Sequence, residues 1–279
     1  MLRCTLSPTR DLNLNDLRIA LLNFAFAKHA NEPFIVRIDD ADKTNIIEDK
    51  DRDLLDTLAL FGISYTQLYY QSHNFKYHLQ FASTLLDKKK AFICFCAEDK
   101  ASPYDGACEN LSSEEVLNNP RPFVIRMKHQ AEGDDCCVIM KTDKYPTPLF
   151  ARACDDMLQG VTTILCEEAH RSDASKEEWI RQSLGYDQAM HYVYVPSFQD
   201  ATYRVQQLLD EGFMPESIAN CLLMPSQILT LEEMLTSVDL HAKMPTSFEM
   251  ETLRFINREH LKKRDDSHHV KKYPKEIVK

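Results

Sequence analysis

Glycine is scarce in this chain. Only 6 of the 279 residues are glycine, about 2%, where roughly 7% is usual in soluble domains. The six lie too far apart for a G-x-G pair or a P-loop. This excludes collagen and glycine-rich linkers, and it argues against a fold that binds phosphate through a glycine-rich loop.

Long apolar runs and positive charge are lacking too. No run approaches the roughly 20 residues of a membrane span, and the first residues have no signal-peptide core. The formal net charge is −10, so nucleic acid would be repelled unless basic residues gather locally. Nine cysteines, an odd number without an export signal, indicate free thiols or a metal site rather than disulfides. We therefore expect a cytoplasmic protein without a membrane span.

The pattern of apolar residues predicts alternating helices and strands. A helix is expected over residues 12–30, with Asn15 or Asp16 as its N-cap, and a strand over 34–38. Further helices are expected over about 45–60 and 73–90. This order favours a parallel α/β sheet, and the chain becomes mainly helical after residue 205.

Ordered motifs over residues 3 to about 262 resemble the catalytic half of glutamyl-tRNA synthetase, a class I aminoacyl-tRNA synthetase. The segments that carry the resemblance are Phe34-Ile35-Val36-Arg37-Ile38-Asp39-Asp40-Ala41-Asp42, Tyr70-Gln71-Ser72, Asp155-Asp156, Gly160-Val161-Thr162 and Leu231-Glu232-Glu233-Met234. The resemblance implies an α/β fold: a Rossmann domain like that of class I synthetases, a small zinc-type insert and a helical C-terminal region like the one that contacts the tRNA stem. No anticodon-binding domain is matched, as in the short glutamyl-Q relatives.

The resemblance also implies a division into domains. The Rossmann-like, catalytic-type domain is split over residues 1–93 and 136–200, and the cysteine-rich insert covers 94–135. Stem-contact-like helices follow over 201–262, and a mobile basic tail is expected over 263–279.

The two ATP-binding signatures of the family are altered or missing. HIGH is replaced by Asn13-Leu14-Asn15-Asp16. A carboxylate about 4 Å from a triphosphate oxygen costs about 4 kcal/mol for each like-charge pair near a surface. KMSKS is expected between Val195 and Leu209, but that segment contains no lysine, so a cation that stabilises the leaving pyrophosphate is lost. We therefore expect helix capping rather than ATP binding at residues 13–16, and no catalytic residues there.

The family's amino-acid pocket is partly retained. By resemblance, Arg3 and Ser7 stand where the family holds its glutamate substrate, and Asp39 replaces a glutamate. Cys166 stands at the arginine that pairs with the substrate side chain, and Arg152, at an asparagine position, is a candidate to replace that arginine. The other interpretation is that Arg3 and Ser7 are remnants that pair with Asp39 or cap a turn.

Three cysteines have the spacing of a metal site. Cys94 and Cys96 alternate along a strand and so point to the same side, and Cys108 can return to them after a turn. Three thiolates and a fourth ligand form a closed tetrahedral zinc site, which is structural rather than catalytic. By resemblance the fourth ligand is Tyr104, with His129 or water as alternatives. Three buried thiols without a metal are the other interpretation.

These departures lead to a functional hypothesis with two alternatives. The leading hypothesis is a truncated glutamyl-tRNA synthetase-like paralogue that does not activate glutamate with ATP. It would act as a non-catalytic accessory, scaffold or regulatory subunit bound to a protein partner. The alternatives are a short ligase that glutamylates tRNA or another acceptor with ATP, and a non-catalytic binder of the tRNA acceptor stem.

Overall fold

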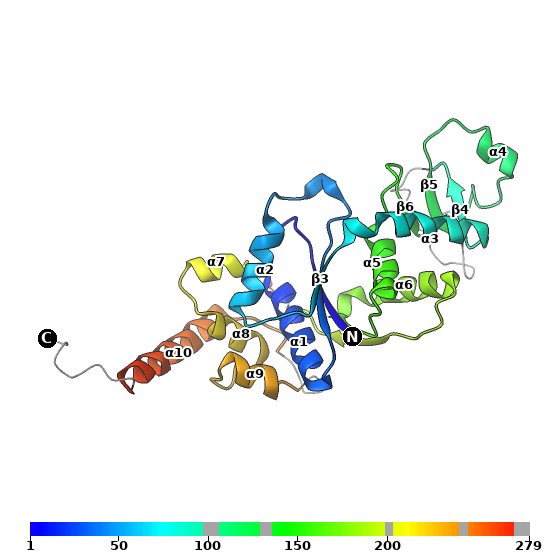
Figure 1. Ribbon diagram of the computed structural model, residues 1–279. Coiled ribbons are helices and arrows are strands. Elements are labelled where there is room, and N and C mark those ends of the chain that lie inside the picture. Colours follow the sequence, from blue (N-terminus) through cyan, green and yellow to red (C-terminus); the bar gives the residue numbers. More distant parts are fainter. Residues whose placement is uncertain (97–105, 129–135, 199–202, 240–244, 271–279) are drawn as a thin grey trace.

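The protein is built around one parallel sheet, and the computed structural model describes residues 1–96, 106–128, 136–198, 203–239 and 245–270 (Figure 1). Its five strands run in the order β3-β2-β1-β7-β8, and every neighbouring pair is parallel. They are β1 (Leu2–Leu6), β2 (Phe34–Ile38), β3 (Gln67–Tyr70), β7 (Thr163–Glu167) and β8 (His191–Val195). The predicted Rossmann-like fold is confirmed, and its strand order reverses direction between β1 and β7.

Strand β2 lies inside the sheet and has no side chain open to water. All five of its residues are buried, as is typical of a parallel strand covered on both faces. Four of them are apolar, but Arg37 is not. A buried guanidinium requires charged partners, and these are described with the site below.

Helices connect these strands and pack against them. They are α1 (Leu14–Ala30), α2 (Lys50–Leu60), α3 (Phe75–Asp87), α5 (Pro148–Leu158) and α6 (Arg171–Leu184), with short 3-10 turns η1 (Lys43–Asn45), η2 (Gln71–Asn74) and η3 (Glu168–His170). The predicted cap of α1 is wrong: Asn13 is the N-cap, because its side chain accepts the Asp16 N–H. Helix α2 begins later than predicted, because Asp49 just before it has φ 56° and interrupts the helical backbone.

A second, three-stranded sheet forms the insert at one end of the molecule (Figure 1). Its antiparallel strands are β4 (Ala91–Cys94), β5 (Val124–Met127) and β6 (Val138–Met140), and a short helix, α4 (Ser113–Leu117), lies between β4 and β5 in the chain. Pairing between these strands takes residues 91–93 and 138–140 into the insert sheet. The boundaries expected at 93/94 and 135/136 therefore cut through this sheet, since sequence alone does not show which strands pair.

Helices dominate the C-terminal region at the opposite end (Figure 1). They are α7 (Val205–Asp210), α8 (Pro215–Leu223), α9 (Leu231–Ser237) and α10 (Met250–Val270). Buried residues of all four join α1 and the sheet in one apolar core. Because α10 continues to Val270, the tail expected from residue 263 is wrong for 263–270, and the rest of it lies outside the described residues. No helix among the described residues is long and apolar enough to cross a membrane.

Candidate functional site

The start of α1 (residues 13–16, with Arg10) is held by its own side chains. The Asn13 side chain accepts the Asp16 backbone N–H at 2.8 Å, and the Asp16 carboxylate accepts the Asn13 N–H at 2.9 Å. This capping box satisfies backbone donors that a helix start otherwise leaves open. The Asp16 carboxylate also pairs with both terminal nitrogens of Arg10, and Leu14 is fully buried.

Two neighbouring segments close against the α1 start. The Val205 N–H, at the beginning of α7, donates to the Leu12 carbonyl at 2.9 Å. From the other side the Asn15 side-chain oxygen accepts the Phe198 N–H at 3.0 Å. The polar side chains of Asn13, Asn15 and Asp16 are therefore all bonded within the protein.

Arg3 and Arg37 meet a single carboxylate in the interior. Asp156 of α5 accepts two hydrogen bonds from Arg3, at 2.9 and 3.0 Å, and one from Arg37 at 2.8 Å. Burial alone would raise the pKa of Asp156, but the two guanidinium groups outweigh it and hold that pKa well below its usual range. Arg3, a predicted ligand residue, thus has two of its three nitrogens engaged inside the protein.

A cavity of about 160 Å³ lies between the sheet and helices α5 and α6, and we call it the strand-end cavity. Side chains of β1, β7 and β8 form one wall, and the cavity adjoins the β1–β7 pair where the strand order reverses. Open parallel sheets bind ligands at such a place. The charged and polar residues that line it include Arg3, Thr5, Asp39, Arg152, Cys166, Asp173, Glu177 and Tyr192. Three of the four predicted ligand residues are therefore brought together there.

Arg152 is paired with two carboxylates in this cavity. Its Nε donates to Glu177 at 2.8 Å, and one terminal nitrogen donates to Asp173 at 3.2 Å. Both acids belong to α6. Arg152 is the predicted replacement for the arginine missing at Cys166. Two of the three Arg152 nitrogens, however, already donate to acids of the protein.

Two carboxyls of the strand-end cavity have pKa values above the usual range for their type. Burial raises the pKa of Glu177, against the opposing effect of Arg152. Burial likewise raises the pKa of Asp39, although the Arg37 Nε donates to it at 3.1 Å. Burial also raises the pKa of the Cys166 thiol to about 11, so that side chain is neutral near pH 7.

Ser7, the fourth predicted ligand residue, lies at a neighbouring cavity of about 290 Å³. Its hydroxyl is 3.0 Å from that of Thr9. Asp39 and Arg152 line this cavity as well as the strand-end cavity, so the two hollows adjoin. The structure therefore places Ser7 beside the other three candidates rather than among them.

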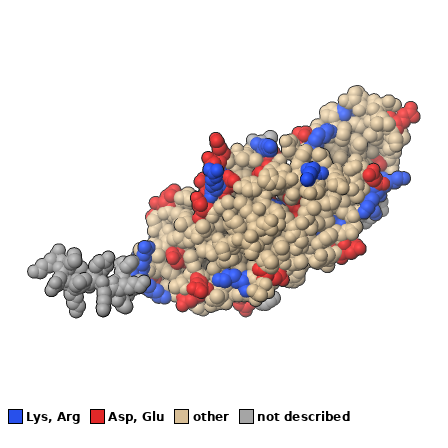
Figure 2. All heavy atoms as spheres, in the orientation of Figure 1, with Lys and Arg blue, Asp and Glu red and all other residues tan. Residues whose placement is uncertain are grey.

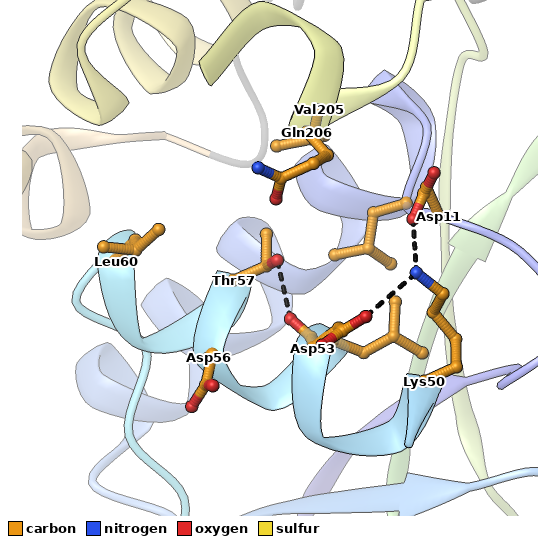
Figure 3. Close-up of a pocket in the computed structure, with 10 residues that line it drawn as sticks. Asp11, Lys50, Asp53, Asp56, Thr57, Leu60, Val205 and Gln206 are labelled. Atoms are coloured by element: carbon orange, nitrogen blue, oxygen red, sulfur yellow. Dashed lines mark hydrogen bonds and ion pairs between the residues drawn. The ribbon is translucent and has the colours of Figure 1, made fainter. Parts of the chain in front are cut away.

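A third cavity, of about 280 Å³, lies between α2, the Asp11–Leu12 loop and α7 (Figure 3). Lys50 reaches across it and pairs with Asp11 at 2.7 Å and Asp53 at 3.1 Å. The charge of Lys50 is thus balanced by two carboxylates of the protein. None of the predicted ligand residues lines this cavity.

The three cysteines of the predicted metal site converge. The sulfur atoms of Cys94, Cys96 and Cys108 all lie within 4.8 Å of one another. Cys94 is the last residue of β4, and Cys108 follows in the chain after residues 97–105. Tyr104 and His129, the candidates for a fourth ligand, lie outside the described residues.

The acidic side of the strand-end cavity, Asp173 and Glu177, is not among the residues predicted from the sequence. Asp173 and Glu177 lie on α6, outside the motifs that carry the resemblance. One signal was available: Glu177 falls between Ala174 and Ile180, three residues from each, on the buried stripe of a helix. A carboxylate on such a stripe requires a nearby cation: Arg152 donates to Glu177, and the buried Arg181 lies 4.0 Å from it.

Comparisons with known proteins agree on the family. The model described as "tRNA synthetases class I (E and Q), catalytic domain" matches residues 2–137 and 111–263. Glutamate–tRNA ligase 1 of Campylobacter fetus subsp. fetus is 39% identical over 313 positions, covering 95% of this chain and 73% of the relative. The enzyme of the same name from Campylobacter jejuni subsp. jejuni serotype O:6 is 40% identical over 309 positions, covering 94% and 72%.

A solved structure is similar over the same range. The crystal structure of glutamate–tRNA synthetase from Elizabethkingia anophelis matches with a TM-score of 0.81 at 20% identity, covering 93% of this chain and 70% of that one. The strand order agrees with the fold of this solved structure, and the family model places the chain among the catalytic domains of class I aminoacyl-tRNA synthetases. Within that class, the chain belongs to the glutamyl-tRNA synthetase-like family.

One difference from these relatives is visible in the lengths alone. The stretch aligned with the Campylobacter fetus enzyme has 313 positions, more than the 279 residues of the whole chain. The relative therefore holds segments that this chain lacks within the aligned region.

Proposed function

We propose that the chain is a short ligase of the glutamate–tRNA ligase type, which joins an amino acid to tRNA or another acceptor with ATP. The observation that carries this proposal is the strand-end cavity, which keeps two arginines at the switch point of a sheet shared with such ligases. Arg3 and Arg152 each have one terminal nitrogen without a hydrogen-bond partner among the described residues. These two groups would hold the carboxylate of the amino acid.

The test is ATP–pyrophosphate exchange by the purified chain with each of the twenty amino acids in turn, with and without total tRNA. Exchange above the background without amino acid is expected for at least one of them. It should fall at least tenfold in Arg152→Gln, since that change removes the guanidinium from the cavity. Arg254→Gln is the control, because Arg254 is exposed on α10, pairs with Glu251 and does not line the cavity. Absence of exchange with every amino acid would contradict the ligase.

A non-catalytic accessory or regulatory subunit is the second candidate, and the closed α1 start favours it. Asp16 stands where the family binds the triphosphate, and its carboxylate is bonded to Asn13 and Arg10. Such a subunit would show no exchange with any amino acid but would stay bound to a protein partner. Crosslinking in native cells, purification of the chain and mass spectrometry would identify that partner.

Binding of the tRNA acceptor stem without chemistry has less support from the surface. On the face shown in Figure 2, Lys and Arg are interspersed with Asp and Glu among the described residues. Phosphate contacts release counterions, so a true stem binder loses affinity steeply as salt rises. Gel shifts with tRNA over a salt series decide this alternative.

We further propose that Cys94, Cys96 and Cys108 hold a structural zinc ion together with one more ligand. The support is the convergence of their sulfur atoms, since three thiolates suit zinc better than magnesium or calcium. Metal analysis should find one zinc per chain, and Cys96→Ser should lose it. Cys221→Ser is the control, because Cys221 is buried in the core of the C-terminal helices. A metal-free wild-type chain of full stability would contradict the site.

A further inference from the structure

We infer that the strand-end cavity binds an amino acid with a positively charged side chain in preference to glutamate. The inference rests on the proposed function in one respect, that an amino acid occupies this cavity. It concerns which amino acid that is, and its basis is the set of charges that the described side chains place around the hollow.

Carboxylates outnumber guanidinium groups in the cavity wall. Asp39, Asp173 and Glu177 line it, against Arg3 and Arg152, so its formal charge is −1. Behind this wall, Arg37 lies against both Asp155 and Asp156. The buried Arg181 lies 4.0 Å from Glu177 and pairs with Glu178 at 2.9 Å, so the groups behind the wall add no net positive charge. A ligand of net charge −1 would make the total more negative, whereas a ligand of net charge +1 would neutralise it.

Only one ligand carboxylate has donors to meet. Arg3 gives two nitrogens to Asp156, and Arg152 gives two to Glu177 and Asp173. The nitrogen that remains on each arginine can serve the α-carboxylate that all amino acids share. A second carboxylate, such as the one in the glutamate side chain, would have to displace one of the bound acids.

The other polar groups of the wall offer no cation for that second carboxylate. Burial raises the pKa values of the Cys166 thiol and the Tyr192 phenol, so both side chains are neutral near pH 7. The Tyr192 hydroxyl already contacts the Arg181 guanidinium. His170 lies at the cavity too, and its Nδ1 is 3.8 Å from Asp173, an acid that already lines the wall.

An ammonium or guanidinium group, by contrast, finds acceptors already in place. Asp173 and Glu177 lie one helical turn apart on α6 and both face the cavity. Burial raises the pKa of Glu177, although Arg152 donates to this carboxylate and Arg181 lies 4.0 Å from it. A further cation between these two acids would lower that pKa, because opposite charge within a few ångströms favours the ionised form.

The test is calorimetric titration of the full chain with arginine, lysine, glutamine and glutamate at pH 7.5 and low salt. We expect arginine or lysine to bind at least tenfold more tightly than glutamate. Glu177→Gln keeps the size of the side chain but removes one acid. It should weaken the basic amino acid at least tenfold and bring its affinity close to that of glutamate.

Asp187→Asn is the matched control, since it changes the net charge by the same amount at an exposed position away from the cavity. It should leave all four affinities unchanged. Glutamate or glutamine binding as tightly as the basic amino acids would overturn the inference, and so would the absence of binding by all four. An equal loss in Asp187→Asn would overturn it as well, because the preference would then come from net charge alone.

These outcomes separate the inference from the proposed function. Pyrophosphate exchange with glutamate as the best substrate would keep the ligase and overturn the charge preference. Binding of arginine or lysine without exchange by any amino acid would support the preference and contradict the ligase.

Discussion

The α1 start and the strand-end cavity arrange their polar groups in opposite ways. At the α1 start, Asn13, Asp16 and Arg10 bond to one another, so their charges and donors are used within the chain. In the strand-end cavity, Glu177 and Asp39 face a hollow, and burial raises their pKa values.

This difference suggests two distinct physical roles. Side chains that satisfy each other contribute to stability, and their replacement should cost what a cap or an ion pair costs. Buried charges beside an open cavity carry a cost in the empty protein that a ligand can remove. Stability measurements and ligand titrations on matched variants can therefore separate the two regions.

The largest effect is expected where the cavity wall meets the core. Asp156→Asn would leave the guanidinium groups of Arg3 and Arg37 without the carboxylate that pairs with both. Removing one partner of a buried ion pair costs about 3–5 kcal/mol. Urea unfolding followed by circular dichroism measures this loss. Asp173→Asn serves as the control, because Asp173 is 39% exposed, and equal midpoints for the two variants would contradict the prediction.

A loss of about 1 kcal/mol is expected when the cap of α1 is removed, as in Asn13→Ala. The alanine cannot accept the Asp16 N–H, so a backbone donor at the helix start loses its partner. Asn13→Ser should keep most of the stability, since serine is an equally good cap. Urea unfolding of both variants checks this. Equal destabilisation by alanine and serine would show that the Asn13 side chain has another role.

The pH dependence of stability should distinguish Glu177 from Asp156. A carboxyl whose pKa is lower in the folded protein stabilises it above the unfolded pKa, near 4, and that stability is lost as pH falls. The pKa of Glu177 is raised instead, so its contribution is unfavourable above about pH 4 and grows as pH rises through the folded pKa.

Glu177→Gln should therefore gain stability relative to the wild type between pH 4 and pH 7, by less than the cost of losing Asp156. Thermal unfolding at unit pH intervals measures the difference between the two proteins. If the variant instead loses stability relative to the wild type as pH rises, the ion pair with Arg152 outweighs the burial of Glu177. The inference that the cavity prefers a positively charged ligand would then be contradicted as well.

The fold could be predicted because it depends on local patterns and ordered motifs. Apolar periodicity predicted α1, and the β-rich run before Asp39 and Asp40 predicted the strand β2, although not its place inside the sheet. The exact helix starts were less predictable, because they depend on single residues. Asp49 interrupts the backbone with a positive φ, and Asn13 rather than Asn15 meets the Asp16 N–H.

The site could be predicted only in part, for a different physical reason. Arg3, Asp39 and Arg152 were found from their positions in family motifs, and they do share one cavity. Their partners Asp173 and Glu177 come from α6, whose place beside α5 is a tertiary contact that no local pattern contains. Sequence alone therefore identified Arg152 as a candidate to bind a substrate, but not the acids that already bind this arginine.

The smallest effect is expected at the outer edge of the α1 start, where Arg10 pairs with Asp16 at the surface. Exposed ion pairs contribute about 0.2–1 kcal/mol, so Arg10→Ala should fall below the cost of Asn13→Ala. Because salt screens exposed charges, the difference from wild type should shrink between low salt and about 0.5 M salt. Urea unfolding at both ionic strengths measures it. The binding of amino acids should not change, since Arg10 does not line the strand-end cavity. A large loss that persists in salt, or a loss of amino-acid binding, would show that the two regions act as one site rather than as a closed helix start beside an open cavity.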